Sequence, residues 1–265
     1  MRTFSFFAAS LFFLSCSSQK TGIPAGEYKP GKWRMIFQDE FNASGSFDTT
    51  KWSYCKRMHP AWAKYLTPSP DYAFLDGGNL VVRMDNKKFA GDNVPYHSGG
   101  IQTKGKFHFL YGKIEVRAKF SGGRGSWPAI WMMPEKDTYG GWPASGEIDI
   151  MEHVNNESIM HQTIHNAAVT NASGGSTATK SSPFKAGDYN VYGIEWAPDK
   201  IEFYVNDSLT YTYAKPLNST FREWPFDQPF YIILNQSGGE GWPGPITDAD
   251  LPFQMHVDWV RVYQK

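Results

Sequence analysis

The stretch that decides both the fold and the chemistry is Gly146-Glu147-Ile148-Asp149-Ile150-Met151-Glu152-His153. Three carboxylates alternate here with large apolar residues, as in a β-strand with one polar and one apolar face. In a regular strand Glu147 and Asp149 share a face, but Glu152 falls on the other one. One extra residue, accommodated as a β-bulge near Met151, restores Glu152 to the polar face. We therefore predict three carboxylates on one face and both isoleucines in a core.

Two glutamates placed in this way are the working parts of a glycosidase. One acts as nucleophile or base, and the other protonates the leaving oxygen. Curvature of the strand toward its acidic face would bring the two carboxyl groups toward the roughly 5–5.5 Å separation of a retaining enzyme. Asp149, lying between them, would raise their proton affinity by like-charge repulsion. The alternative is a solvated acidic strand face, which the surrounding apolar and aromatic residues disfavour.

The stretch also resembles the active-site signature of glycoside hydrolase family 16, and its laminarinase-like branch in particular. The resemblance covers the chain from about Trp33 onward and includes three further segments: Trp127-Pro128-Ala129-Ile130-Trp131-Met132-Met133-Pro134, Trp224-Pro225-Phe226-Asp227-Gln228-Pro229-Phe230 and Val257-Asp258-Trp259-Val260-Arg261-Val262-Tyr263. It implies that Glu147 is the nucleophile, Asp149 its assisting partner and Glu152 the general acid/base. It also implies a jelly-roll β-sandwich with a substrate cleft on the concave sheet.

The strand pattern independently predicts an all-β protein. Apolar and charged residues alternate from Lys113 to Phe120, and turn residues recur throughout the chain, with 25 Gly and 17 Pro. Asn206-Asp207 is a plausible hairpin turn, and Ser219 to Trp224 suggests the one short helix. Many short strands separated by turns indicate a sandwich or a barrel. Further strands are expected at Asn79 to Met84, Ile194 to Trp196, Ile201 to Val205, Tyr231 to Leu234 and Met255 to Tyr263.

The amino-acid composition indicates which classes of molecule the protein binds. The 265 residues contain 26 Lys plus Arg and 26 Asp plus Glu, so the net charge is zero. No basic patch suggests nucleic acid. The 10 Trp exceed what packing usually requires, and flat aromatic faces suit sugar rings. We expect a monomer whose partner is a polysaccharide or a glycan.

The N-terminus predicts a lipid anchor. A charged start is followed by an apolar run from Phe4 to Leu14, which is too short to span a membrane and is typical of a secretory signal. The run ends at Cys16 in a segment that resembles a bacterial lipoprotein box. We predict a signal peptide at residues 1–16, lipidation of Cys16, a tether at residues 17–32 and a single catalytic domain at residues 33–265. The protein would then be anchored in the bacterial cell envelope. Ordinary cleavage of the signal is the alternative.

Several residues are candidates for substrate contact. Trp127 and Trp131 would share a strand face, and the resemblance places them beside the catalytic strand, although Trp131 could equally be a core residue. Trp142 and Trp242 each lie in a Gly-Trp-Pro loop, which favours exposure at a cleft rim. The resemblance adds Asn79, which follows a Gly-Gly turn, and His165, which lies on the neighbouring strand.

A metal site is not predicted. His153, His161 and His165 are a possible set of ligands, but the helical metalloprotease spacing is absent, and members of the resembling family work without a metal. We expect no required cofactor. A structural calcium on the convex side occurs in parts of that family, and Asp258 is the position that could hold it. Arg117 is expected to make a structural salt bridge rather than a substrate contact.

The predicted function is a secreted retaining endo-β-glycosidase. The resemblance favours a β-1,3- or mixed β-1,3/1,4-glucan as its substrate. The segment from Pro60 to Pro70 departs from that of typical laminarinases, however, and Trp62 within it would form a replacement binding platform. One alternative is therefore an endo-β-1,4-galactosidase acting on poly-lactosamine of mucin-type O-glycans or on algal galactan. A second is a non-catalytic lipoprotein that captures glycans.

Overall fold

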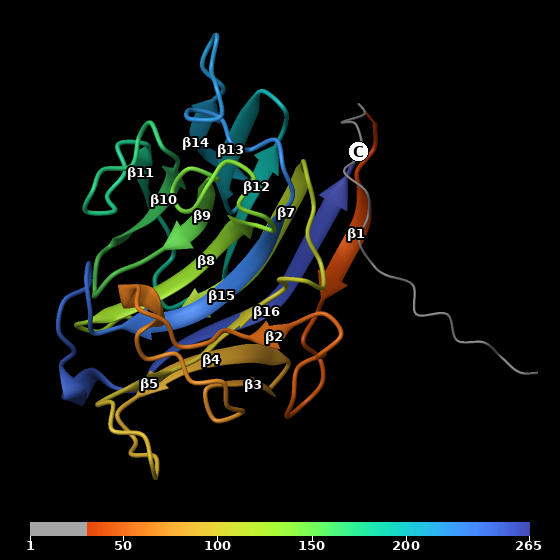
Figure 1. Cartoon of the computed structure of the whole chain (residues 1–265). Helices are drawn as coiled ribbons and strands as arrows, with labels where there is room; N and C mark the ends of the chain where they lie inside the picture. The colour runs from red at the N-terminus through yellow and green to blue at the C-terminus, as the bar shows by residue number, and fades with distance from the viewer. Residues whose placement is uncertain (1–30) are drawn as a thin grey trace, which may run out of the picture.

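The computed structural model describes residues 31–265 as two stacked antiparallel sheets, whose strands bend along their length (Figure 1). Two short 3-10 turns, η1 (Ala61–Ala63) and η2 (Asp248–Asp250), accompany the strands. The all-β class and the sandwich predicted from the sequence are confirmed. The strands are β1 (Arg34–Asp39), β2 (Ser53–Tyr54), β3 (Ala73–Asp76), β4 (Asn79–Asp85), β5 (His97–Ser98), β6 (Gly100–Gln102), β7 (Gly112–Phe120), β8 (Ser126–Pro134), β9 (Glu147–Glu152), β10 (Ile159–His165), β11 (Thr179–Pro183), β12 (Asn190–Trp196), β13 (Lys200–Val205), β14 (Ser208–Ala214), β15 (Phe230–Gly238) and β16 (Phe253–Gln264).

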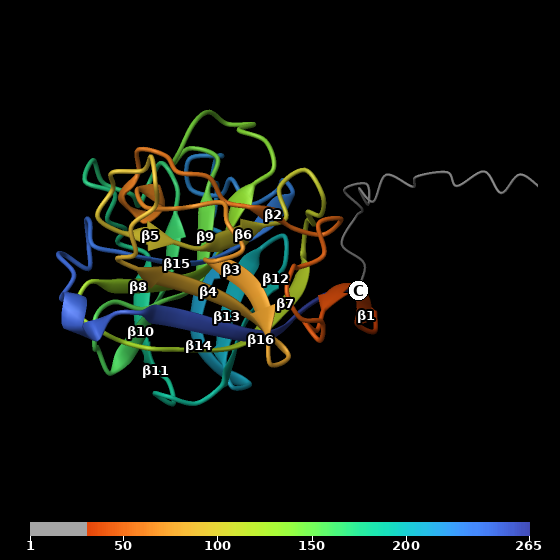
Figure 2. The same ribbon diagram turned by 90° about the horizontal axis from the view of Figure 1, so that it is seen from below.

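Each sheet interleaves strands that are distant in the sequence. The nine-stranded sheet runs β14-β13-β12-β7-β16-β4-β3, with β1 paired to β16 and β5 paired to β4. The seven-stranded sheet runs β11-β10-β9-β8-β15-β6-β2, so β9, which carries the three carboxylates, lies near its middle. Figure 2 shows the two layers from below. A strand in this position is supported by neighbours on both edges, which fixes the direction of its side chains.

The core lies between the two sheets. Along β7 the buried and half-buried residues alternate without a break, and Ile114, Val116 and Ala118 point inward. Ile148 and Ile150 of β9 join the same cluster from the opposite sheet, as predicted. Each aliphatic side chain of this size contributes roughly 1.5–3 kcal/mol on burial. The apolar face of β9 therefore anchors the strand and leaves its polar face turned away from the core.

The local turn predictions had mixed outcomes. Asn206 and Asp207 join β13 to β14 with φ values of 49° and 65°, the left-handed conformation of a tight hairpin turn. The helix predicted at Ser219 to Trp224 is wrong, because the segment forms a turn. Burial of the Trp224 side chain, which stacks on Tyr213, together with the proline that follows it, keeps the segment from continuing as a helix.

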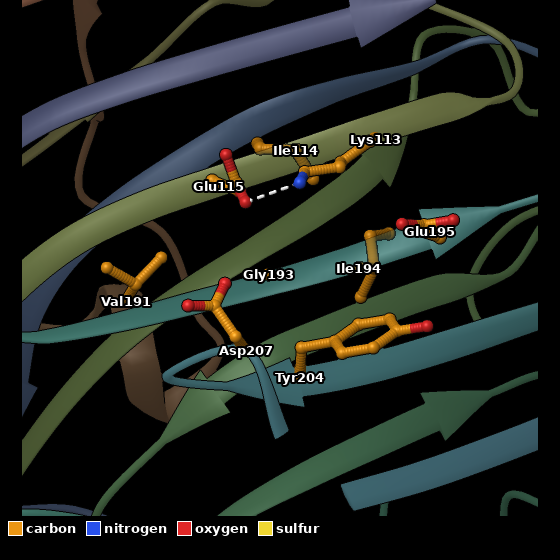
Figure 3. A pocket seen from close by; sticks show the side chains of 9 residues that line it. All are labelled: Lys113, Ile114, Glu115, Val191, Gly193, Ile194, Glu195, Tyr204 and Asp207. Carbon is orange, nitrogen blue, oxygen red and sulfur yellow. Dashed lines mark ion pairs between the residues drawn. The ribbon is translucent and has the colours of Figure 1, made fainter. Parts of the chain in front are cut away.

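The outer face of the nine-stranded sheet carries a hollow where β12 has a glycine (Figure 3). Gly193 lies opposite Glu115 on one side and Tyr204 on the other. A Cβ atom there would approach the carbonyl oxygen of Ile114 to 2.7 Å, so close strand packing explains the glycine. Glu115 is held by Lys113 at 2.6 Å. This hollow lies on the opposite sheet from the three carboxylates.

The predicted signal segment, Cys16 and all but the last two residues of the predicted tether lie outside the described residues. Within residues 31–265, no helix has the length and apolarity needed to cross a membrane. Cys55, the other cysteine, is buried as a free thiol.

Candidate active site

A β-bulge in β9 brings the three carboxylates to one face. On β8, Ala129 and Trp131 are two residues apart, but their partners on β9, Glu152 and Asp149, are three apart. The register with β10 is shifted at the same place. The extra residue is accommodated at Ile150 and Met151, both of which are buried in the core. The bulge predicted near Met151 is therefore confirmed, and Glu147, Asp149 and Glu152 all lie on the outer face of the seven-stranded sheet, hereafter the carboxylate face.

Glu147 lies among polar and aromatic groups supplied by two other segments. The indole N–H of Trp142 donates a hydrogen bond to Glu147 Oε2 at 2.5 Å. His165 is the cross-strand partner of Glu147 on β10, and its Nε2 lies 3.3 Å from Asp149 Oδ2. The Trp142 ring is 47 % exposed and lies 5.7 Å from the His165 ring, measured between centroids. Trp142 thus combines an open aromatic face with a direct contact to a carboxylate.

Glu152 has a corresponding environment at the other end of the strand. The indole N–H of Trp127 donates to Glu152 Oε1 at 3.0 Å. Trp242, which is 48 % exposed, packs edge-on against Trp127 and against His161 on β10. The loop after β15 therefore reaches across to β10 beside Glu152. Trp142 and Trp242 consequently flank the carboxylates from opposite ends of β9.

Burial and mutual repulsion raise the pKa of all three carboxyl groups. Desolvation is the largest cause in each case, followed by the charge of Asp149 for Glu147 and the charge of Glu152 for Asp149. For Glu152, desolvation and the charge of Glu147 raise the pKa to about 7, while the Trp127 hydrogen bond opposes the rise. With a pKa of about 7, the Glu152 carboxyl group can carry a proton near neutral pH. The site therefore retains a proton that can be given to a leaving group.

The two aromatic residues predicted further along the carboxylate face differ in exposure. Trp131 is buried, and its indole N–H donates to Asn235 Oδ1 at 2.7 Å, so packing dominates its environment. Trp62, in η1, packs edge-on against Trp131 with ring centroids 4.7 Å apart and stays half-buried. The η1 turn thus lies over β8 and β15 on the same face as the carboxylates.

Two other candidates lie on the opposite sheet. Asn79 begins β4 of the nine-stranded sheet, and its side-chain oxygen accepts a hydrogen bond from the Tyr189 hydroxyl at 2.6 Å. The structure therefore does not bring Asn79 to the carboxylates, because strand order rather than sequence proximity decides its sheet. Asp258, the predicted calcium position, pairs with Arg117 at 2.5 Å. Arg117 thus makes the expected salt bridge, and a cation at Asp258 would have to displace it.

The histidines do not converge on one point. His153 is buried on the core side against Phe120, and His161 pairs with Glu157. Glu147, Asp149 and His165 do offer atoms within 4.8 Å of one another. Because His165 faces Glu147 across the strand pair and its Nε2 lies 3.3 Å from Asp149 Oδ2, these contacts also orient the two carboxylates.

Two supporting residues were missed in the sequence. Asn235 holds the Trp131 indole, and the Thr170 hydroxyl lies 3.3 Å from His165 Nδ1. The polar run Asn235-Gln236-Ser237, directly after the apolar residues of β15, was a signal for the first. No local pattern marks Thr170, which lies in a loop beyond β10.

Comparison with known proteins identifies the family. The model of the glycosyl hydrolases family 16 matches residues 66–261, which include all of β9 and most of both sheets. The chain belongs to glycosyl hydrolase family 16. It is therefore a glycoside hydrolase, an enzyme that cleaves O-glycosyl bonds, and a retaining mechanism by double displacement is known for its family. Family 16 enzymes need no cofactor.

Three similar proteins differ in the substrates that their names give. A keratan-sulfate endo-1,4-beta-galactosidase of Sphingobacterium multivorum is 63% identical over 233 residues, which are 88% of this chain and 55% of that protein. This chain thus spans about half the length of that relative. The solved laminarinase of Rhodothermus marinus has a TM-score of 0.82 at 36% identity, covering 89% of this chain and 99% of that one. A third structure comes from work on endo-acting O-glycanases with which prominent human gut bacteria initiate mucin breakdown. It has a TM-score of 0.77 at 33% identity and covers 87% and 99% of the two chains.

Proposed function

We propose that this family 16 enzyme is an endo-β-1,4-galactosidase that cleaves internal galactosidic bonds of poly-lactosamine chains, as carried by mucin-type O-glycans and keratan-type glycans. The observation that carries the proposal is the 63% identity to a keratan-sulfate endo-1,4-beta-galactosidase, compared with 36% to a laminarinase of the same fold. The alternative drawn from the sequence is thereby favoured over the glucan. The η1 segment supports the choice, because it departs from the laminarinase pattern and places Trp62 on the carboxylate face.

In the proposed mechanism the two glutamates divide the work. The ionised Glu147 carboxylate attacks the anomeric carbon as Glu152 gives its proton to the departing glycosidic oxygen, which leaves a glycosyl-enzyme ester. Glu152, now ionised, takes a proton from water, and that water displaces Glu147 from the sugar. The raised pKa of Glu152 supplies the acid for the first step. Asp149, buried between them, and His165 keep Glu147 in position.

The exposed tryptophans complete the proposed substrate site. Trp142 and Trp242 flank the carboxylates and present open ring faces, against which sugar rings can rest. Trp127 contacts both Glu152 and Trp242, so it links the substrate platform to the acid/base group. A protein that only captures glycans would have no need of two glutamates that each accept an indole N–H. The family assignment also supports an enzyme.

A panel of defined oligosaccharides tests the substrate. We expect products from poly-lactosamine with a galactose at the new reducing end, and little release from laminarin or mixed-linkage glucan. The glucan remains the second candidate because of the TM-score of 0.82 to a laminarinase. Efficient release from laminarin, without any from poly-lactosamine, would reverse the order of the two.

We also propose that the protein is lipid-anchored in the cell envelope through Cys16. The support is the apolar run after Arg2 and the position of Cys16 at its end. Cys16→Ser should move the protein from the membrane fraction to a soluble or unprocessed form, as followed by fractionation and immunoblotting. Unchanged membrane association of that variant would rule out the anchor while leaving the catalytic proposal intact.

A further inference from the structure

We propose that a hollow at the η1 end of the carboxylate face binds an anionic group carried by the glycan, either a sulfate ester or the carboxylate of a sialic acid. The hollow, here called the basic hollow, has a volume of about 650 Å³. That volume lies within the roughly 300–1,000 Å³ typical of small-ligand sites. The inference rests on the proposed function, because it concerns how that substrate is selected. The residues that line the hollow are Arg57, Met58, His59, Ala61, Lys64 and Glu240.

The basic hollow adjoins the substrate site rather than a remote surface. The Trp62 ring packs on Trp131 of β8, and the Trp62 carbonyl accepts a hydrogen bond from Ser237 Oγ of β15 at 2.5 Å. Its neighbours Ala61 and Lys64 line the hollow. Glu240, on the other side, lies two residues before Trp242, which flanks the carboxylates. The hollow therefore lies where the η1 turn meets the Trp242 loop.

The segment that contains the η1 turn carries basic residues and no acidic ones. Residues 55–70 contain Lys56, Arg57, His59 and Lys64 and no acidic residue. Two acids from elsewhere approach them: Asp92 binds Arg57 through both oxygens at 3.0 and 2.7 Å, and Glu240 pairs with Lys64. Of these cations, Arg57 and Lys64 line the hollow, and each is paired with one of the two acids, while Lys56 is not among the lining residues.

Hydrogen-bond donors remain available in the basic hollow. Arg57 has five N–H groups and is fixed by its fork-like contact with Asp92, so it is already oriented. Lys64 has three N–H groups, and one hydrogen bond to Glu240 leaves others free to turn toward a ligand. A charge-assisted hydrogen bond to a sulfate or carboxylate oxygen is about twice as strong as a neutral one.

The charges at the catalytic centre and in the basic hollow differ in sign, and this difference indicates which glycan chains the enzyme prefers. The centre of the carboxylate face carries Glu147, Asp149 and Glu152, which repel a nearby anion. The basic hollow instead offers the N–H donors of Arg57 and Lys64 to an anion at the η1 end of the same face. An unsubstituted, neutral sugar would gain no charge-assisted hydrogen bond from Arg57 and Lys64 there. Anionic chains should therefore be preferred, provided that their charge reaches the η1 end.

Opposite charge changes at one ion pair test the proposal. Lys64→Gln removes a cation from the basic hollow, and Glu240→Gln removes the anion that competes for it. We would measure kcat/KM for unsubstituted, 6-sulfated and sialylated poly-lactosamine oligosaccharides of matched length, and express each as a ratio to the unsubstituted substrate. Lys64→Gln should lower the ratio about threefold and Glu240→Gln should raise it by a similar factor, the scale of one partly exposed charge. Raising the salt concentration should reduce both effects.

Matched controls come from the opposite sheet. Lys200 and Glu202 of β13 form a comparable exposed pair at 2.9 Å, and Lys200→Gln and Glu202→Gln should leave the ratios unchanged. A response of the sulfated arm alone assigns the hollow to a sulfate ester, and a response of the sialylated arm alone assigns it to a carboxylate. The inference is overturned if the kcat/KM ratios do not change, or change in the same direction in Lys64→Gln and Glu240→Gln. Cleavage of poly-lactosamine would still uphold the proposed function in that case. Failure to cleave any poly-lactosamine overturns both.

Discussion

Glu147 and Glu152 each accept one indole N–H, from Trp142 and Trp127 respectively. The two donors oppose the rise in carboxyl pKa that burial produces. In the proposed mechanism Glu147 must be ionised when substrate arrives, and the Trp142 hydrogen bond favours that state. The acid/base group must cycle between both states, and a pKa of about 7 suits that role. The two glutamates thus share one kind of donor, so this hydrogen bond alone does not distinguish their roles.

The first prediction separates the two glutamates. Glu147→Ala should lose nearly all turnover, because no glycosyl-enzyme ester can form, and azide should then restore a product of inverted configuration. Glu152→Ala should still react with substrates that have a good leaving group, and azide should give a product of retained configuration. Product stereochemistry by proton NMR provides the measurement. The opposite pattern would exchange the two roles.

A second prediction concerns the Trp127 donor. Trp127→Phe keeps an aromatic ring but removes the hydrogen bond that stabilises ionised Glu152, so the pKa of Glu152 should rise further. The acid must be protonated to act, and activity falls as pH rises through that pKa. The alkaline limb of kcat/KM against pH should therefore move upward, from about 7 in the wild type. Trp242→Phe changes the ring contact alone and serves as the control, in which the limb should stay in place.

At the scale of elements, the bulge in β9 and the η1 turn affect the carboxylate face in different ways. The bulge sets which side chains share the carboxylate face, and the buried Ile150 and Met151 hold it in place. The η1 turn covers part of that face through Trp62 and Trp131. The bulge thus aligns the carboxylates, and under the proposed function the η1 turn limits which sugars can approach them.

Trp62→Ala tests the η1 turn. If Trp62 contacts substrate, kcat/KM should fall about tenfold or more, which corresponds to roughly 1.4 kcal/mol of lost transition-state binding. Kinetics on the best oligosaccharide and thermal unfolding are measured together. A drop in Tm with unchanged kinetics would make Trp62 a packing residue for Trp131 only.

The sequence was sufficient where a pattern is local. Alternation predicted β7, and the carboxylate spacing predicted the bulge in β9, because both depend on neighbours along one strand. It failed for Asn79, whose side chain ends on the other sheet, since strand order depends on contacts between distant segments. The ambiguity of Trp131 had the same origin, because its partner Asn235 lies 104 residues away. Spacing alone cannot reveal such pairs.

At the scale of the whole molecule, the site should cost stability. The folded state raises the pKa of Glu152 from its usual 4.5 to about 7, so it holds a proton that the unfolded chain releases at lower pH. Stability from this group is complete below about pH 4.5 and is lost as pH rises to about 7. Glu152→Gln should therefore raise Tm above pH 7 by about 2–4 °C, equivalent to roughly 1 kcal/mol in a domain of this size. The difference should shrink near pH 4; a constant offset across pH would point to packing instead.

The position of β16 has a consequence for how the protein is made. This strand pairs with β7, β4 and β1, so it holds the nine-stranded sheet together from within. Among the described strands it is also the last to leave the ribosome. A nascent chain that lacks it has two separated half-sheets with unpaired edges, and pairings between such distant segments form slowly. The nine-stranded sheet therefore cannot close before β16 has been made, and a stop codon a few residues before Phe253 would leave a product for chaperones and proteases rather than a shortened enzyme.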